Sequence, residues 1–146
     1  MADSTRNHRY RLREHTADLK VEIYGRDLPE LFVNAAFMIF DVMLELDQVV
    51  EQQVETVEIK SADLPELLLD WLRELLFLFS VRGFVCRQVR ISRLSSKPAE
   101  LEALLAGETY DPKRHGLKIE IKTPTYHQYA VERLPEGYRA TVVFDV

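Results

Sequence analysis

The stretch VEIYGRDLPEL at residues 21–31 decides how this chain of 146 residues folds, because the chain contains it twice. It returns as VEIKSADLPEL at residues 57–67, an offset of 36 residues, with eight of eleven positions identical. In each copy a strand-like segment leads to an Asp, a Pro two residues later and a Glu three residues after the Asp. That order is typical of a helix start, in which the Asp caps the helix and the Pro lies in its first turn. Each copy therefore predicts a strand followed by a helix.

Two amphipathic helices are expected after these starts. Apolar residues recur with helical spacing in both segments, and the second stripe is broader, so we expect the second helix to lie deeper in the core. An aromatic stripe at this spacing packs in a core and does not require a cofactor. The first stripe is Leu28, Leu31, Phe32, Ala35, Met38, Ile39 and Val42, and the second is Leu64, Leu67, Leu68, Trp71, Leu72, Leu75, Leu76 and Phe79.

Strand-like segments surround the helices and predict the fold class. The repeat unit is strand–helix–strand, and two such units favour an α+β fold, a two-layer sandwich with two main helices packed on a mostly antiparallel sheet. We expect one domain at residues 10–146, after a flexible tail at residues 1–9. Residues 99–108 consist of helix formers, so local propensity favours a helix there. The remaining strands are predicted at residues 10–14, 20–24, 49–60, 84–95, 117–122, 127–133 and 138–146, the last two as a hairpin.

Composition and charge exclude several classes of protein. The net charge of −5 argues against a dedicated nucleic-acid binder, and the longest apolar run, at residues 75–79, is too short to cross a membrane. The polar N-terminus contains no signal peptide, and the single Cys86 fits a reducing cytoplasm. Residues 41–70 hold nine acids, whereas residues 81–99 hold five bases and no acid. We interpret these stretches as two oppositely charged solvated faces, in preference to a phosphate-binding strip.

Carboxylates near the two ends of the chain are the candidates for chemistry. The connection at residues 15–18 carries an imidazole, a hydroxyl and the carboxylate of Asp18, although a plain turn is the favoured interpretation of this stretch taken alone. Asp145 and the terminal carboxyl of Val146 place two further carboxylates at the end of a strand. If Asp18 lies at the same sheet edge, the three form the start of a site for a hard divalent cation such as calcium. Lys122 and His127 flank the next predicted turn, and beside a carboxylate cluster they would be suited to binding phosphate or orienting a metal-bound group. On spacing alone, an ordinary edge lysine and a turn histidine are the favoured interpretation.

Motifs for other chemistries are absent from the sequence. There is no phosphate-binding glycine loop, no dinucleotide glycine pattern, no zinc-protease motif and no serine nucleophile elbow. The four histidines are too scattered to predict a zinc site. The sequence therefore gives little reason to expect an enzyme with chemistry of its own.

Five short motifs, in this order and at these separations, carry a resemblance to a known family. The chain resembles the archease family, small cytoplasmic proteins that activate the tRNA-splicing RNA ligase, over nearly its whole length. The motifs are HTAD at residues 15–18, DWLRELLF at 70–77, GETYDP at 107–112, Lys122 with TYH at 125–127, and FDV at 144–146.

The resemblance implies a fold and a function. The fold is a duplicated strand–helix–strand–strand module, which requires residues 99–108 to be a strand. The function is non-enzymatic: the protein promotes guanylylation and multiple turnover of a ligase that uses GTP and a divalent metal to join RNA 3′-phosphate and 5′-hydroxyl ends. The resemblance assigns metal binding, most simply of calcium, to Asp18, Asp145 and Val146, and activation of the partner to Asp18, Lys122 and Asp145, with only indirect contact to RNA ends. His15, Tyr126 and His127 are candidates for supporting positions around that site.

Two alternative functions remain open at this stage. A chaperone-like adaptor would bind clients through an exposed apolar patch and would need no carboxylate cluster. A metal-dependent hydrolase acting alone would need the carboxylates but no ligase. Substitution of the carboxylates distinguishes the three, because it should spare a chaperone, abolish the activator, and abolish the hydrolase even without ligase present.

Overall fold

The structure, a computed structural model, describes residues 5–6, 9–13 and 18–146. Its main helices are α1 (Leu28–Met43) and α2 (Leu64–Ser80), with a short helix α3 (Pro112–His115) and a 3-10 turn η1 (Leu46–Gln48). The strands are β1 (Thr5–Arg6), β2 (Tyr10–Arg13), β3 (Leu19–Gly25), β4 (Gln53–Ser61), β5 (Phe84–Ser96), β6 (Ala99–Thr109), β7 (Thr123–Leu134) and β8 (Gly137–Asp145).

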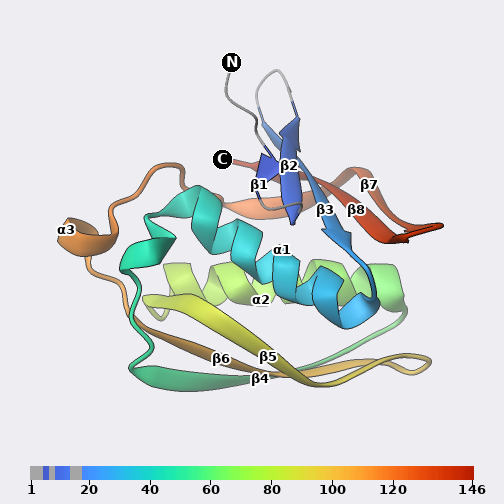
Figure 1. Ribbon diagram of the computed structural model, residues 1–146, viewed down its shortest axis with the longest axis horizontal. Helices are drawn as coiled ribbons and strands as arrows, with labels where there is room; N and C mark the ends of the chain where they lie inside the picture. Colours follow the sequence, from blue (N-terminus) through green and yellow to red (C-terminus); the bar gives the residue numbers. More distant parts are fainter. Residues whose placement is uncertain (1–4, 7–8, 14–17) are drawn as a thin grey trace.

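The strands form two antiparallel sheets rather than one. The first sheet has the order β1-β2-β3-β8-β7, and the second has the order β4-β6-β5. Helices α1 and α2 lie side by side between the sheets and contact strands of both (Figure 1). The predicted α+β class with antiparallel pairing is confirmed, but the helices form a middle layer with a sheet on each side. Each helix has buried apolar residues on two faces. A sheet on each side of the helix layer covers both faces, which accounts for this arrangement.

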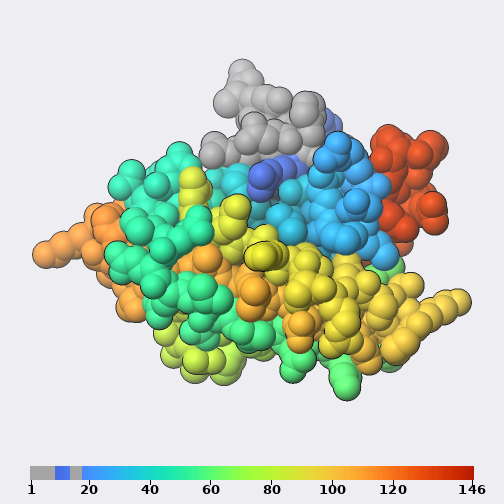
Figure 2. Space-filling model, turned by 60° about the horizontal axis from the view of Figure 1, so that its bottom comes forward, coloured from blue at the N-terminus to red at the C-terminus, as the bar shows by residue number. Residues whose placement is uncertain are grey.

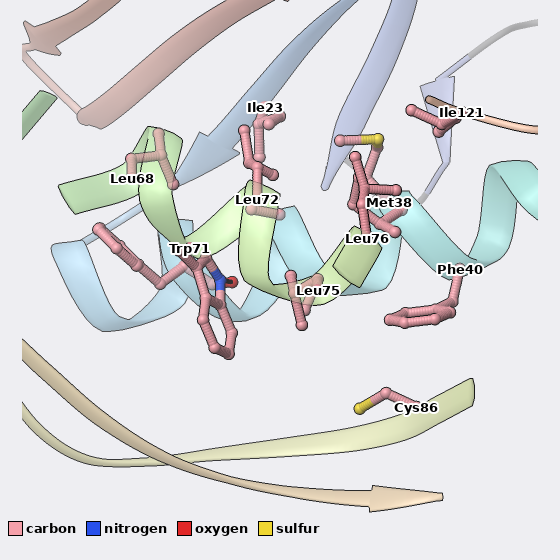
Figure 3. Packing of buried hydrophobic residues seen from close by; sticks show 14 of the residues in the cluster. Ile23, Met38, Phe40, Leu68, Trp71, Leu72, Leu75, Leu76, Cys86 and Ile121 are labelled. Atoms are coloured by element: carbon pink, nitrogen blue, oxygen red, sulfur yellow. Dashed lines mark hydrogen bonds between the residues drawn. The ribbon is translucent and has the colours of Figure 1, made fainter. Parts of the chain in front are cut away.

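The core fills the space around the helix layer. Trp71 and Leu75 of α2 point toward the β4-β6-β5 sheet, whereas Leu72 points toward Ile23 of β3 on the other side (Figure 3). All four side chains are fully buried, and the indole N–H of Trp71 donates to the carbonyl oxygen of Phe32 at 2.9 Å. Both helices belong to the core, but α1 is the more deeply buried, with eleven of its 16 residues buried against eight of 17 in α2, so the prediction that α2 lies deeper is wrong.

Both helix starts in the repeat have the predicted geometry. Asp27 precedes α1, and its carboxylate accepts from the backbone N–H of Glu30 at 2.9 Å. Asp63 precedes α2 and accepts from the N–H of Glu66 at 3.0 Å. The strands ahead of them differ in place, because β3 lies inside the five-stranded sheet and β4 lies at an edge of the other. The repeat therefore specifies two local helix starts, and a duplicated module stays a prediction.

Residues 99–108 are a strand, which contradicts their helical propensity and agrees with the family resemblance. Strand β6 pairs with β4 on one side and β5 on the other, so it is the central strand of its sheet. Alternate residues Leu101, Ala103 and Leu105 point into the core and are almost completely buried. Burial of this alternating face outweighs the weak preference of Ala, Leu and Glu for helix.

The strand predicted at residues 117–122 is wrong. The segment carries no strand pairing, although its backbone is held by single hydrogen bonds, from Lys118 N–H to Met43 and from Lys122 N–H to Asp145. Ile121 is buried, but Ile119, expected on the same face, is 39% exposed. Alternation alone was misleading here, because the chain follows the end of α1 and has no neighbouring strand.

The acidic and basic stretches lie against each other. Each of three arginines on or beside β5 forms an ion pair with an acid from residues 41–70. All of these side chains are partly exposed, so each pair contributes little to stability but the basic strip is largely neutralised. The pairs are Arg82–Glu55, Arg87–Asp47 and Arg93–Glu58.

Among the residues described, no helix is long and apolar enough to cross a bilayer. In the space-filling view the turn between β5 and β6 projects at one end of the molecule and α3 at the other (Figure 2).

Candidate functional site

The predicted residues Asp18, Asp145 and Lys122 lie at one end of the five-stranded sheet. Leu19 of β3 pairs with Phe144 of β8, so the antiparallel register places Asp18 opposite Asp145 just beyond the last pair. On the other side of β8, Asp145 pairs with Thr123 of β7, and its carbonyl oxygen accepts from the N–H of Lys122 at 2.9 Å. Strand β8 therefore places Asp145 between the other two residues, which are far apart in the sequence.

The exposure of these residues leaves their functional groups accessible. Asp145 and Lys122 are exposed, Asp18 is half-buried, and Val146 follows β8 with 44% of its surface exposed. Among the residues described, the ammonium group of Lys122 makes no ion pair or hydrogen bond, so it remains available for a ligand. The sheet end therefore presents carboxylates and one unpaired cation next to each other.

The donor set at this sheet end suits a hard cation. Two side-chain carboxylates and the carboxylate of Val146 supply only oxygen ligands, which calcium and magnesium prefer. Across residues 18–146 and the described residues before them, no three His, Cys, Asp or Glu side chains are grouped closely enough to hold a metal. A cation at this sheet end would need oxygen ligands in addition to the side chains of Asp18 and Asp145.

The side chain of Tyr126 contacts helix α2. The pairing of β7 with β8 is interrupted between Thr125 and Ala130, and Gln128 has a positive φ of 56°. This bulge turns Tyr126 toward α2, where its hydroxyl donates to Glu66 at 2.7 Å. His127 is exposed within the same bulge. His15, the remaining candidate, lies outside the described residues.

A buried polar network beyond β6 is the functional-looking feature that was not predicted. The carboxylate of Glu108 is almost completely buried and accepts two hydrogen bonds of 2.7 Å from the guanidinium of Arg114. It also accepts from the N–H of Val50 at 2.7 Å and lies 2.9 Å from Nε2 of His115. The Arg114 guanidinium lowers the pKa of Glu108 to about 2, so the group is ionised at neutral pH.

The hydrogen bonds of His115 fix its tautomer. Its Nδ1 accepts from the N–H of Asp111 at 2.9 Å, so the ring proton belongs on Nε2, which donates to Glu108. The ring is fully buried and stacks on Tyr110, and the His115 carbonyl accepts from the N–H of Glu45 at 2.8 Å. The network therefore ties α3 to the end of α1 and to β6, and its role is structural.

One sequence signal pointed to this network. Glu108 and Asp111-Pro112 belong to the GETYDP motif, and a Glu at the buried end of an apolar strand needs a cationic partner. The spacing alone did not identify Arg114 and His115 as those partners.

Comparison with known proteins identifies the family. The family model of the archease protein family matches residues 10–146. This chain belongs to the archease family. The archease of Methanosarcina acetivorans is 39% identical over 140 residues, which cover 94% of this chain and 96% of the relative. The archease of Pyrococcus abyssi is 38% identical over 136 residues, covering 91% and 95%.

Two solved structures have the same fold as this chain. The solution structure of Methanobacterium thermoautotrophicum protein 1598 matches with a TM-score of 0.79 and 30% identity, covering 95% of this chain and 99% of the other. The crystal structure of a Thermotoga maritima archease, described as a possible chaperone, matches with a TM-score of 0.65 over 92% and 94% of the two chains. That second structure is 24% identical and supports the fold alone.

Proposed function

We propose that this archease is a non-enzymatic activator of the tRNA-splicing RNA ligase, promoting its guanylylation and its multiple turnover. The observation that carries the proposal is the convergence of Asp18, Asp145 and Lys122 at one sheet end in a chain of this family. A net charge of −5 suits docking to a basic RNA-handling enzyme better than docking to RNA itself. A cytoplasmic location accompanies this proposal and stays a prediction.

In this proposal the carboxylates of Asp18, Asp145 and Val146 hold a divalent cation, with calcium the simplest choice for an all-oxygen site. When bound, the cation supplies positive charge that neutralises and orients phosphate oxygens. Asp18 and Asp145 come from neighbouring strands, so the sheet fixes their separation without needing the cation. The same sheet end docks at the mouth of the ligase active site.

Lys122 supplies a second positive charge beside the carboxylates. Its backbone is fixed by the hydrogen bond to Asp145, while its side chain extends into solvent without a partner among the described residues. An ammonium held in this way pairs with a phosphate of the nucleotide or of the RNA end. We expect its contribution to appear only when the ligase is present.

The test is RNA ligation by the cognate ligase at multiple turnover, with wild type, Asp18→Ala, Asp145→Ala and Lys122→Ala. Wild type should raise turnover, and each variant should lose most of that increase while keeping its circular dichroism spectrum. Glu136→Gln is the matched control, because Glu136 is an exposed carboxylate in the turn at the opposite end of β8. An equal rise in turnover with the carboxylate variants would refute the proposed site.

Metal binding has a test that does not depend on the ligase. Calorimetric titration of wild type with calcium should give a binding isotherm that Asp18→Asn and Asp145→Asn each weaken by at least about tenfold, about 1.4 kcal/mol. Titration with magnesium measures the preference for the metal. Equal calcium affinity in wild type and both variants would place the cation elsewhere.

A chaperone-like adaptor is the second candidate, since one structural relative is described as a possible chaperone. It predicts that wild type and the carboxylate variants suppress aggregation of an unrelated unfolded protein equally well. A stand-alone hydrolase is a weaker third candidate and predicts metal-dependent turnover of a phosphoester without ligase.

A further inference from the structure

The solvent-facing side of α2 carries a groove next to the candidate site. Its first part is a cleft of about 210 Å³ between α2 and the start of β7. Arg73, Phe77 and Ser80 line it from α2, and Lys122 and Pro124 line it from the other side. Lys122 therefore belongs both to this cleft and to the sheet end described above. We use the name α2 groove for this cleft together with the adjoining cleft described in the next paragraph.

A second cleft continues the groove along α2 toward β4. Its volume is about 590 Å³, and it shares Arg73 and Phe77 with the first. These two residues are four positions apart, so they lie on the same face of the helix. The other residues that line this second cleft are Glu58, Ile59, Lys60, Asp70 and Glu74.

Exposed aromatic side chains flank Arg73 on both sides. Phe77 is 46% exposed and Tyr126 is 62% exposed, which is unusual for large side chains in a chain whose other phenylalanines are mostly buried. The guanidinium of Arg73 lies 5.5 Å from the centre of the Tyr126 ring and is held by Asp70 at 2.9 Å. Fixed aromatic and arginine side chains of this kind dominate the binding energy of protein interfaces.

Charge decides the chemistry of the occupant. The first cleft contains two cations, Arg73 and Lys122, and no carboxylate, so it is complementary to an anion. Leu76, Phe77 and Pro124 contribute apolar surface to this cleft, and Ser80 and Thr123 contribute hydroxyl groups. The adjoining cleft has three carboxylates against two cations, which would repel a chain of phosphates running along the groove. A peptide with a single carboxylate beside an apolar side chain suits both clefts, whereas a nucleic-acid strand suits only the first.

We propose that the α2 groove docks a segment of the partner protein that inserts an apolar side chain against Phe77 and presents a carboxylate to the guanidinium of Arg73, while Lys122 keeps the phosphate-binding role proposed above. This inference rests on the proposed function, in which the partner is the RNA ligase. Docking here places the partner directly beside Asp145, because Lys122 is shared by the groove and the sheet end. The groove accounts for affinity, and the sheet end accounts for activation.

The test measures ligase turnover as a function of archease concentration for wild type, Phe77→Ser and Ser80→Asp. Truncating Phe77 should raise the concentration giving half-maximal activation by at least about tenfold, with the same maximal activation at saturation. Ser80→Asp places a negative charge in the first cleft and should raise that concentration in the same direction, more strongly at low salt. Val54→Ser is the matched control, because Val54 is 61% exposed on β4 and lines neither cleft.

The outcomes separate the docking proposal from the proposed function. Half-maximal activation within about twofold of wild type for both groove variants would overturn the groove as a docking site and leave the activator proposal standing. No activation by wild type at any concentration would overturn both. Binding of wild type to single-stranded RNA without ligase, weakened by Phe77→Ser, would show that the groove holds RNA instead of a protein segment. Circular dichroism of each variant shows whether the fold is retained.

Discussion

The substitution Glu108→Gln tests the buried network with little change in volume. Glu108 accepts hydrogen bonds from Arg114 and from the N–H of Val50, and it faces the Nε2–H of His115. A glutamine has only one oxygen acceptor, and its amide group would face donors that it cannot satisfy. The variant therefore removes the charge of the network and leaves at least one buried donor without an acceptor.

The pKa of Glu108 sets the magnitude and the pH dependence. A pKa of about 2, against an ordinary 4.5, corresponds to about 3 kcal/mol of stabilisation at neutral pH. The side chain of Arg114 is 38% exposed, so solvent screening reduces this to about 2 kcal/mol. Because the pKa is lowered on folding, the stabilisation is complete above about pH 4.5 and is lost as the pH falls toward 2.

Urea unfolding followed by the fluorescence of the single, fully buried Trp71 measures the effect. Glu108→Gln should unfold with a free energy about 2 kcal/mol below wild type at pH 7, and the difference should shrink between pH 4.5 and 2. The exposed Glu136→Gln serves as the control and should stay within about 0.5 kcal/mol of wild type. A difference below 0.5 kcal/mol at pH 7, or one that is constant down to about pH 2.5, would refute the reasoning.

Three further predictions concern local features. Asp63→Ala removes the side-chain acceptor for the N–H of Glu66 and should lower the unfolding free energy by about 1 kcal/mol in the same urea assay. Gly107→Ala has no room for a methyl group against the carbonyl of Val85, and it should lower the melting temperature by several degrees, as scanning calorimetry will show. Burial raises the pKa of Cys86 to about 12, so its thiol should resist Ellman's reagent at pH 8 in the folded protein and react after unfolding in urea.

The helices were predictable because their signals are local. The cap Asp27 and its repeat Asp63 satisfy backbone donors three residues along the chain, so nothing distant is needed to form either helix start. The hairpin of β7 and β8 was predictable for the same reason, since Gly137 and its neighbours form the turn between two adjacent strands. The relative burial of the two helices was not predictable in this way, since α1 is more deeply buried than α2 although the predicted apolar stripe of α2 is broader.

The second sheet was not predictable from local pattern because its strands are assigned by what lies beside them. The local propensity of residues 99–108 favours a helix, and pairing with the flanking strands β4 and β5 makes them a strand. Residues 117–122 show the opposite error, since they alternate like a strand but lack a neighbouring strand to pair with. In both segments the deciding factor is whether a strand lies beside them to pair with.

The candidate site also has a part that the sequence predicted and a part that it did not. Asp18 and Asp145 were proposed together only on the condition that their strands share a sheet edge, and the pairing of β3 with β8 meets that condition. The metal and the role of Lys122 stay predictions, because register gives position and not occupancy. Glu108 was missed as a centre of interactions because its partners Arg114 and His115 reach it through the short helix α3, which the sequence analysis did not predict.

The repeat shows why similar sequence does not by itself give equivalent structure. Both copies encode the same helix start, yet β3 is flanked by strands on both sides and buries Val21 and Ile23 completely, while β4 is an edge strand in which only Val57 is buried. The difference follows from the residues outside the repeat: β3 pairs with β2 on one edge and β8 on the other and packs against α1, whereas β4 pairs with β6 alone. The chemistry proposed at the sheet end depends on that asymmetry, because only the strand paired with β8 places its preceding carboxylate opposite Asp145.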